Sequence, residues 1–339
     1  MSAGPDQASG PGSVGSAPAG PPPIEVRGLV KRYGELTAVA GVDLTVRFGD
    51  VYGYLGPNGA GKTTSLRMML GLIRPTEGTV RLFGRDPIES VRALEGVAGF
   101  VEAPTFYPYL SARRNLEMLA AYDGGGAGDR IESALDTVEL TDRARDRVGG
   151  YSHGMRQRLG IAAALLRDPK LLLLDEPATG LDPAGMRDMR LLIRRLADQG
   201  MTVLLSSHLL TEVEDVCNRV AIVRSGRIVY EGEIAALQRG AGTSYRLQTT
   251  NDQRALAVCR AQPGVTDARL DEHGRITFTA DEAAAGLLSQ ALIEAGALIK
   301  AMAPQTITLE DLFFSFTEGD GTQPAPLPAP DTPAPQPAR

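Results

Sequence analysis

Residues 56–64 combine glycines with a lysine and two threonines, a pattern suited to holding phosphate. The run reads Gly56, Pro57, Asn58, Gly59, Ala60, Gly61, Lys62, Thr63 and Thr64. Glycines let backbone N–H groups wrap an anion, the lysine supplies a cation to the outer phosphates, and the first threonine offers a hydroxyl to magnesium. The run therefore predicts a site for a nucleotide and Mg²⁺, although a glycine-rich turn with a capping threonine is the bland alternative.

An acidic pair, Asp175 and Glu176, follows directly after the leucine run at 171–174. The apolar run predicts a buried strand, and parallel sheets place their ligands at the carboxyl ends of such strands. One carboxylate can hold magnesium through water while the next orients or deprotonates an attacking water, as phosphoryl transfer to water requires. A helix-capping acidic pair is the alternative, which the upstream phosphate loop disfavours.

Segment 151–155 is a second candidate anion-binding element, with Ser152 and Gly154 at the start of a predicted helix over 154–166. A serine and a glycine at a helix start expose N–H groups and the helix dipole to an anion. A simple helix cap has the same residues. Because one nucleotide carries one triphosphate, a chain with two such elements needs a reason for the second.

Strands alternate with helices over residues 24–240, which implies a mainly parallel sheet. Period-2 alternation predicts antiparallel-type strands near the start, and the phosphate loop lies between a buried strand and a helix whose N-terminus adds positive charge to the site. The predicted strands are 24–30, 42–46, 51–55, 99–101, 171–174, 202–206 and a hairpin at 219–230, and the predicted helices are 62–70, 114–122, 129–139, 154–166 and 183–197.

The pattern breaks at 239–242, and a smaller α+β unit is predicted for 243–317. Its expected elements are a strand at 245–249, a helix at 253–260, a hairpin at 265–278 and a helix at 282–295. No catalytic spacing occurs in this unit. Residues 1–23 are predicted to be a disordered Gly/Pro-rich leader and residues 318–339 a disordered Pro-rich spacer, with a Pro-binding partner as the alternative.

The net charge, the cysteines and the longest charge-free stretch limit the classes of partner that are expected. The formal net charge is -6, which gives no basic field for a duplex, so no nucleic acid is expected. Cys217 and Cys259 have no partner spacing for a disulfide framework or a zinc site. The charge-free stretch before Glu212 contains Gly, Ser and His and is too short and polar to cross a bilayer. A cytoplasmic location is expected, with any membrane role supplied by a partner.

With these motifs in this order, residues 24–240 resemble the ATP-binding subunits of ABC transporters. The resemblance implies an α/β P-loop ATPase with a central mainly parallel sheet, an antiparallel β subdomain and a helical subdomain. It also implies ATP and Mg²⁺ as cofactors, a homodimer joined through its ATP sites, and a separate transmembrane permease that holds the chain at the inner face of the membrane.

The resemblance also gives the second anion element a role. The family signature usually reads Leu-Ser-Gly-Gly-Gln, whereas this chain has Tyr151-Ser152-His153-Gly154-Met155 and keeps the serine and the second glycine. In the family the dimer is head-to-tail. Ser152 is therefore expected to reach the γ-phosphate of the ATP on the other subunit.

Further roles follow by the same likeness. Glu176 is expected to be the catalytic base, and His208, after the 202–207 strand, to be the switch histidine that contacts the γ-phosphate and that base. Asp182 matches the loop that signals across the dimer, and Tyr33 the aromatic that stacks on adenine. A structural histidine and a packed surface tyrosine are the alternatives for His208 and Tyr33.

Glu102 departs from the family pattern, because it occupies the position of a glutamine that senses magnesium and the membrane partner. A carboxylate can also ligate magnesium, while adding negative charge beside a triphosphate. Glu102 is accordingly a candidate metal residue together with Thr63 and Asp175.

Three features resemble the bacterial antibiotic-resistance exporter branch, whose members handle bacitracin, lantibiotics or anthracyclines: Glu102, the Tyr-Ser-x-Gly-Met signature and the segment 309–313. Residues 102–116 are the predicted dock for the membrane partner, with Phe106, Tyr107 and Tyr109 exposed. The alternative is that these aromatic side chains pack inside.

Two other classes of function compete with a transporter subunit. A non-transport ABC ATPase acting on DNA or ribosomes usually carries coiled-coil or zinc insertions or fuses two ATPase units, and none is seen in this sequence. A plain P-loop kinase would leave Ser152, Gly154 and His208 without a purpose. A neighbouring gene for a multi-spanning membrane protein would separate the first alternative from a transporter.

Overall fold

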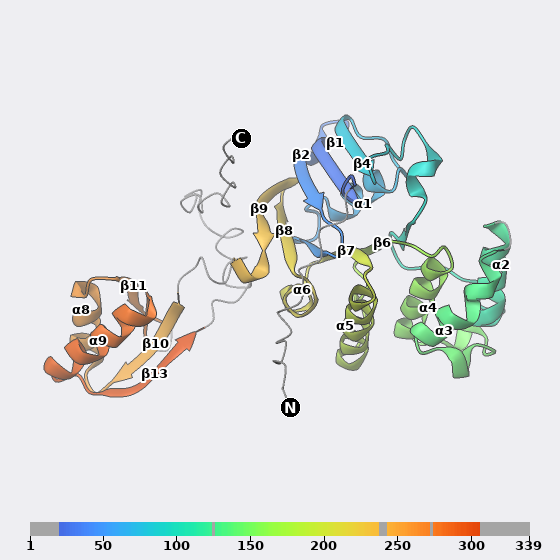
Figure 1. Ribbon diagram of the computed structural model, residues 1–339. Coiled ribbons are helices and arrows are strands. Elements are labelled where there is room, and N and C mark those ends of the chain that lie inside the picture. The colour runs from blue at the N-terminus through green and yellow to red at the C-terminus, as the bar shows by residue number, and fades with distance from the viewer. Residues whose placement is uncertain (1–19, 124–125, 237–242, 272–273, 306–339) are drawn as a thin grey trace, which may run out of the picture.

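The computed structural model describes residues 20–123, 126–236, 243–271 and 274–305 (Figure 1). The predictions for most of the leader, the Pro-rich tail, the break at 239–242 and segment 309–313 lie outside these residues. No helix in the described ranges combines the length and the apolar character that a membrane span needs.

A six-stranded sheet in the order β5-β6-β7-β3-β8-β9 forms the centre of the part of the chain before residue 237. Every neighbouring pair is parallel except the β8–β9 hairpin. The strands are β3 (Val51–Leu55), β5 (Val97–Phe100), β6 (Leu171–Asp175), β7 (Thr202–Ser207), β8 (Arg219–Arg224) and β9 (Arg227–Glu233). This sheet, with antiparallel sheets and helices around it, confirms the predicted α/β class.

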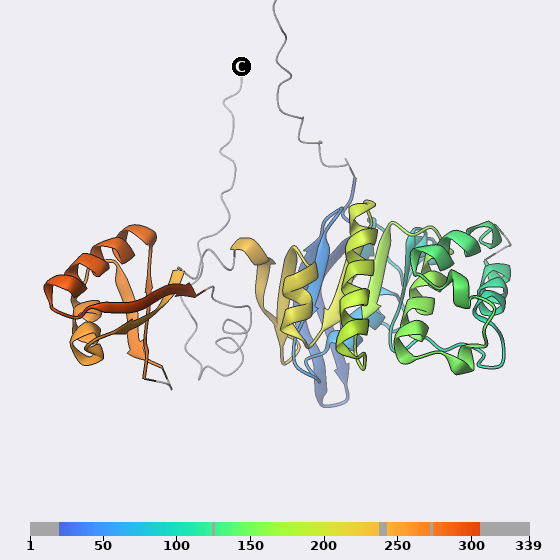
Figure 2. The same ribbon diagram turned by 90° about the horizontal axis from the view of Figure 1, so that it is seen from below.

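Both faces of the central sheet are covered, which explains its unbroken apolar strands. Along β6, Leu171 and Leu173 pack into one core, whereas Leu172 and Leu174 pack into another. The first core lies against α1 (Lys62–Met69) and a three-stranded antiparallel sheet in the order β2-β1-β4, and the second against the helices that lie between residues 112 and 216 (Figures 1 and 2). The strands of the smaller sheet are β1 (Ile24–Tyr33), β2 (Leu36–Val46) and β4 (Glu77–Leu82).

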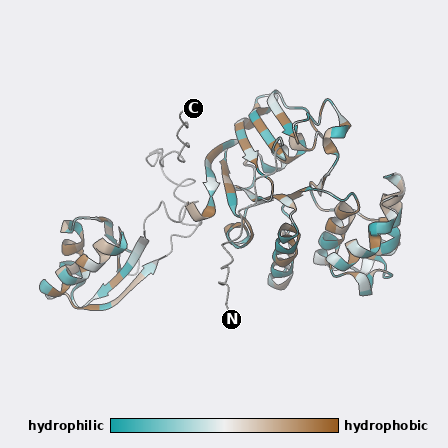
Figure 3. Ribbon diagram, viewed as in Figure 1, coloured by the Kyte–Doolittle hydropathy of each residue, from teal (hydrophilic) through white to brown (hydrophobic). Residues whose placement is uncertain are grey.

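A group of helices within residues 112–165 carries the signature segment. Its helices are α2 (Ala112–Tyr122), α3 (Ile131–Thr137) and α4 (His153–Leu165), and the segments between them contain short 3-10 turns at Gly128–Arg130, Thr141–Arg143 and Val148–Gly150. A further 3-10 turn, Val91–Leu94, lies between β4 and β5. Helices α5 (Pro183–Asp198) and α6 (Leu210–Val216) cover the central sheet beside this group. Along α5, hydrophobic residues alternate with hydrophilic ones (Figure 3), and the buried face consists of Met189, Leu192, Ile193 and Leu196.

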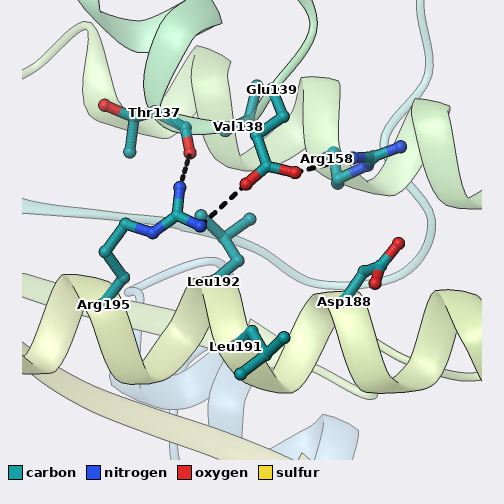
Figure 4. Close-up of a pocket in the computed structure, with 8 residues that line it drawn as sticks. All are labelled: Thr137, Val138, Glu139, Arg158, Asp188, Leu191, Leu192 and Arg195. Atoms are coloured by element: carbon teal, nitrogen blue, oxygen red, sulfur yellow. Dashed lines mark hydrogen bonds and ion pairs between the residues drawn. The ribbon is translucent and has the colours of Figure 1, made fainter.

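An ionic clamp joins the helical group to α5. Glu139, which follows α3, has a carboxylate oxygen 2.7 Å from Nη2 of Arg195 on α5, and its other oxygen is 3.8 Å from Nη1 of Arg158 on α4 (Figure 4). Arg195 also donates to the Thr137 carbonyl at 3.2 Å. These contacts connect the signature helix α4 to the layer that covers the central sheet.

The C-terminal unit has a core of its own around Leu247, Phe278 and Leu288. Its four strands form an antiparallel sheet in the order β11-β12-β10-β13, which with two helices gives the split β-α-β-β-α-β arrangement of ferredoxin-like units. The elements are β10 (Thr243–Thr249), α8 (Asp252–Ala261), β11 (Val265–Leu270), β12 (Ile276–Ala280), α9 (Glu282–Glu294) and β13 (Ile299–Gln305).

Candidate nucleotide site

The 56–64 loop connects β3 to α1 and folds around its own lysine. Gly59 and Gly61 have φ of 81° and 98°, a region that glycine enters without the strain of a side chain. A Cβ on Gly61 would lie 2.3 Å from the Ala38 carbonyl oxygen. The Lys62 side chain is only 4% exposed, and its Nζ donates to the carbonyls of Gly56 at 2.8 Å and Pro57 at 3.2 Å.

This geometry suits a bound phosphate. Asn58 and Gly59 are exposed at the loop tip, whereas Ala60 is buried and its N–H bonds the Pro57 carbonyl at 3.2 Å. Thr64 is half-buried in the first turn of α1. Backbone N–H groups of a glycine-rich loop, a helix N-terminus and a lysine ammonium are the kinds of donor that phosphate oxygens need.

The Asp175 carboxylate lies against Thr63, as a magnesium site would require. Thr63 Oγ1 donates to Asp175 Oδ2 at 2.8 Å. The other carboxylate oxygen, Oδ1, accepts a hydrogen bond from the Ser206 hydroxyl, which in turn accepts from the Glu176 N–H at 3.0 Å. Hydroxyl and carboxylate oxygens are the ligands Mg²⁺ prefers, so these residues fit that ion.

Glu176 projects into the same site from a left-handed backbone conformation, with φ of 46°. Its Oε1 is 3.2 Å from Lys62 Nζ. Its Oε2 accepts from Thr179 Oγ1 at 2.8 Å and lies 3.0 Å from His208 Nδ1. The structure thus brings the phosphate loop, both carboxylates and His208 together.

The surroundings of Glu176 keep its carboxyl ionised. Burial raises its pKa, but the hydrogen bonds from Thr179 and Lys62 and the charges of Lys62 and His208 outweigh burial, so the pKa falls below the usual glutamate value. A lowered pKa means that the carboxylate carries no proton near neutral pH. It can therefore accept one from water.

Ser152 and Asp182 do not join this cluster within one copy. Ser152 is exposed and caps α4, accepting from the Met155 N–H at 3.2 Å. Asp182 caps α5, accepting from the Gly185 N–H at 2.9 Å. Gly154 lies beside them, with its Cβ position 3.5 Å from Leu181 Cδ2. The described residues thus contain a signature element whose hydroxyl bonds only its own helix.

Tyr33 and Glu102 lie at the margins of the site. Tyr33 ends β1 with 49% of its surface exposed, and Lys31 Nζ is 5.0 Å from its ring centroid. Glu102 follows β5 with φ of 73° and forms an ion pair with Arg67 of α1. Its carboxylate is thus held by a cation on the helix that follows the phosphate loop.

One expectation for the docking surface is wrong. Phe106 is half-buried and packs against the helical core instead of being exposed, because the neighbouring Tyr107 backbone is pinned by hydrogen bonds to the Asn115 side chain. Tyr107 and Tyr109 are exposed by 50% and 64%.

Ser206 and Thr179 are site residues that sequence reasoning missed. Ser206 pairs in register with Asp175 between β7 and β6 and joins that carboxylate to the Glu176 backbone. The available signal was a polar Ser-Ser-His sequence ending an otherwise apolar strand beside the acidic pair. Thr179 had no such signal, because its contact with Glu176 depends on the turn between them.

The loop at 56–64, the paired oxygens of Thr63 and Asp175 and the ionised Glu176 at the carboxyl edge of a mainly parallel sheet fit a P-loop ATPase. Residues 39–179 match the ABC transporter family. The chain is 27% identical to a solved ATP-binding subunit of an ABC transporter, with a TM-score of 0.57 over 64% of this chain and 92% of that one.

Two curated relatives extend over most of the chain. The bacitracin transport ATP-binding protein BcrA of Enterococcus faecalis is 37% identical over 300 residues, 88% of this chain and 97% of its own. The daunorubicin/doxorubicin resistance ATP-binding protein DrrA of Streptomyces peucetius is 36% identical, over 87% and 92%. The chain belongs to the ABC transporter family as an ATP-binding subunit, and it is an ATPase.

Proposed function

We propose that two copies of this chain close head-to-tail on two ATP molecules and two Mg²⁺ ions. Closure and reopening power a separate transmembrane permease that exports an antibiotic, a drug or another amphipathic compound. The substrate class rests on the relatives that are named for bacitracin transport and daunorubicin resistance. The chain would then work in the cytoplasm, held at the inner membrane face by its permease.

The exposed signature of each copy carries this proposal. One copy assembles the phosphate loop with Asp175, Glu176 and His208, whereas Ser152 faces outward at a helix N-terminus. A helix N-terminus with an exposed Ser152 can supply donors to a triphosphate that another copy holds through Lys62. A second copy placed head-to-tail completes both sites at once.

Each side chain has a distinct part in hydrolysis under this proposal. Tyr33 stacks on adenine, residues Gly56–Thr64 cradle the phosphates, and Thr63 and Asp175 hold Mg²⁺. The metal, when bound, neutralises charge that develops on the β- and γ-phosphates. Glu176 takes a proton from the attacking water. His208 orients the Glu176 carboxylate through the 3.0 Å contact between Nδ1 and Oε2. Ser152 and Gly154 bind the γ-phosphate of the ATP held by the other copy. Asp182 belongs to the loop that signals between the two copies.

The exposed tyrosines of residues 102–116 are proposed to dock the permease. The Tyr107 and Tyr109 rings lie 5.8 Å apart and tilted, forming an aromatic patch on the helical group. Exposed aromatic side chains of this kind favour protein interfaces.

The variant Tyr107→Ala/Tyr109→Ala is expected to abolish export while ATP hydrolysis by the isolated subunit stays within about two-fold of wild type, because truncating a docking patch leaves a distant site intact. Export and ATPase activity are measured in cells and with purified protein. Tyr122→Ala is the matched control, since Tyr122 is 86% exposed at the end of α2 and outside the patch. Full export by the double variant would rule out this dock.

Glu102 is proposed to contact magnesium once its ion pair with Arg67 breaks. Glu102→Gln is expected to leave ATP affinity unchanged but to raise the magnesium concentration for half-maximal hydrolysis by about two- to five-fold, because a nearby negative charge is lost. The measurement is a magnesium titration of ATPase activity. Arg67→Gln is the control that breaks the ion pair and keeps the carboxylate. Superimposable titrations of Glu102→Gln and wild type would contradict the proposal.

A further inference from the structure

His153 occupies a place in the signature where the related motif has glycine, and its ring contacts the turn that carries the catalytic base. His153 is the first residue of α4. Its Nε2 lies 3.1 Å from the carbonyl oxygen of Thr179. The ring also lies against Gly180, where a Cβ would be 3.5 Å from ring atoms Cδ2 and Nε2.

The contact assigns a tautomer to His153. A carbonyl oxygen can only accept, so Nε2 must carry the hydrogen. The Gln157 amide nitrogen, also a donor, lies 3.5 Å from the same Nε2, while Gln157 Oε1 is buried without a partner among the described residues. Exchanging the nitrogen and oxygen of this amide removes the donor–donor contact and gives Oε1 a partner, because Nε2–H then faces Oε1. The single Nε2–H thus donates to the Thr179 carbonyl at 3.1 Å, with Gln157 Oε1 as a longer second acceptor at 3.5 Å.

The contact continues to the catalytic glutamate through one residue. Thr179 accepts from His153 with its carbonyl and donates its hydroxyl to Glu176 Oε2 at 2.8 Å. The Thr179 N–H also bonds the Glu176 carbonyl at 3.1 Å. A single turn therefore joins the N-terminus of the signature helix to the carboxylate that activates water.

We propose that His153 is a positioning residue that couples the two ATP sites of the dimer. The inference rests on the proposed head-to-tail dimer, in which Ser152 of one copy binds the ATP of the other copy, while Glu176 serves the ATP of its own. Displacement of the signature helix onto the partner's γ-phosphate then moves Thr179 through the His153 ring. The carboxylate of Glu176 reaches the position from which it accepts a proton only when ATP occupies the other site.

The test compares His153→Leu, which keeps bulk but cannot donate, with His153→Gln, whose amide nitrogen reaches the place of Nε2 and does not titrate. Purified full-length protein is assayed for kcat, KM and the Hill coefficient in ATP. Two coupled sites allow a coefficient up to about 2. We expect His153→Leu to lower it to about 1 and to lower kcat about two- to ten-fold, the effect of one lost hydrogen bond, with KM unchanged.

His153→Gln is expected to restore both kcat and the Hill coefficient, a rescue that a merely structural role would not require. Thr179→Val removes only the hydroxyl, and its effect should not add to that of His153→Leu if both act along one path. If His153→Leu fails to fold, His153→Gly, the residue of the common signature, takes its place.

A wild-type Hill coefficient near 1, an unchanged coefficient in the loss variant, or additive effects with Thr179→Val would each overturn the coupling. None of these outcomes tests whether the proposed dimer forms. That question is tested separately, by trapping the hydrolysis-deficient variant Glu176→Gln with ATP. The coupling can therefore fail while the dimer stands, and a failure of the dimer is recognised by its own test.

Discussion

Glu176→Gln is expected to slow ATP hydrolysis by about 100-fold to 10,000-fold, because it removes the carboxylate that we propose accepts the proton from the attacking water. The amide keeps the size of the carboxylate and can still contact Thr179 and Lys62, which now surround Glu176 at 2.8 and 3.2 Å. ATP affinity should therefore stay within a few-fold of wild type. With hydrolysis blocked, ATP should also hold the dimer closed.

Steady-state ATPase assays measure the rate, and equilibrium binding of a fluorescent ATP analogue measures the affinity. Glu89→Gln is the matched control, since Glu89 is an exposed glutamate outside the cluster and its variant should retain full activity. Hydrolysis by Glu176→Gln at the wild-type rate would show that the base has been assigned to the wrong residue.

Lys62→Ala is expected to weaken ATP binding by about 10-fold to 150-fold, the equivalent of one charge-assisted hydrogen bond to phosphate. The Lys62 ammonium is buried and already points into the loop, where it bonds the carbonyls of Gly56 and Pro57. Removing it leaves residues 56–64 without their one cationic side chain and leaves the Glu176 carboxylate without its lysine partner. Hydrolysis should fall with binding.

Isothermal titration with ATP and magnesium measures this loss. Lys170→Ala is the control, because Lys170 is exposed before β6 and its removal should not change the affinity. A thermal melt confirms that both variants are folded. Wild-type ATP affinity in Lys62→Ala would contradict the assignment of residues 56–64 as the phosphate cradle.

Long apolar strands and the phosphate loop were predictable from sequence because their patterns are local. The leucine run of β6 predicts a buried strand, and the Gly61–Lys62 junction predicts the turn before α1, each from neighbouring residues alone. The missed elements have weaker patterns. In β4 only Val80 and Leu82 are buried, α6 has no side-chain cap, and β13 contains Pro304, which is tolerated because β13 is an edge strand.

Contacts between distant segments were not predictable in the same way. The ion pair between Glu102 and Arg67, the Ser206 bridge and the ring of His153 against Gly180 each join residues from separate turns or strands. No periodicity in the sequence encodes such pairs. The role of Ser152 is harder still to predict from patterns in the sequence, because its proposed phosphate is bound to another copy. Only the family resemblance indicated this role.

The central claim is that each copy completes the ATP site of the other, and a crystal or cryo-EM structure of Glu176→Gln with ATP and Mg²⁺ tests it most directly. We expect a symmetric dimer in which Ser152 Oγ lies within hydrogen-bonding distance of the γ-phosphate held by the partner's phosphate loop. Nucleotide-bound single copies, with Ser152 far from every triphosphate, would contradict it.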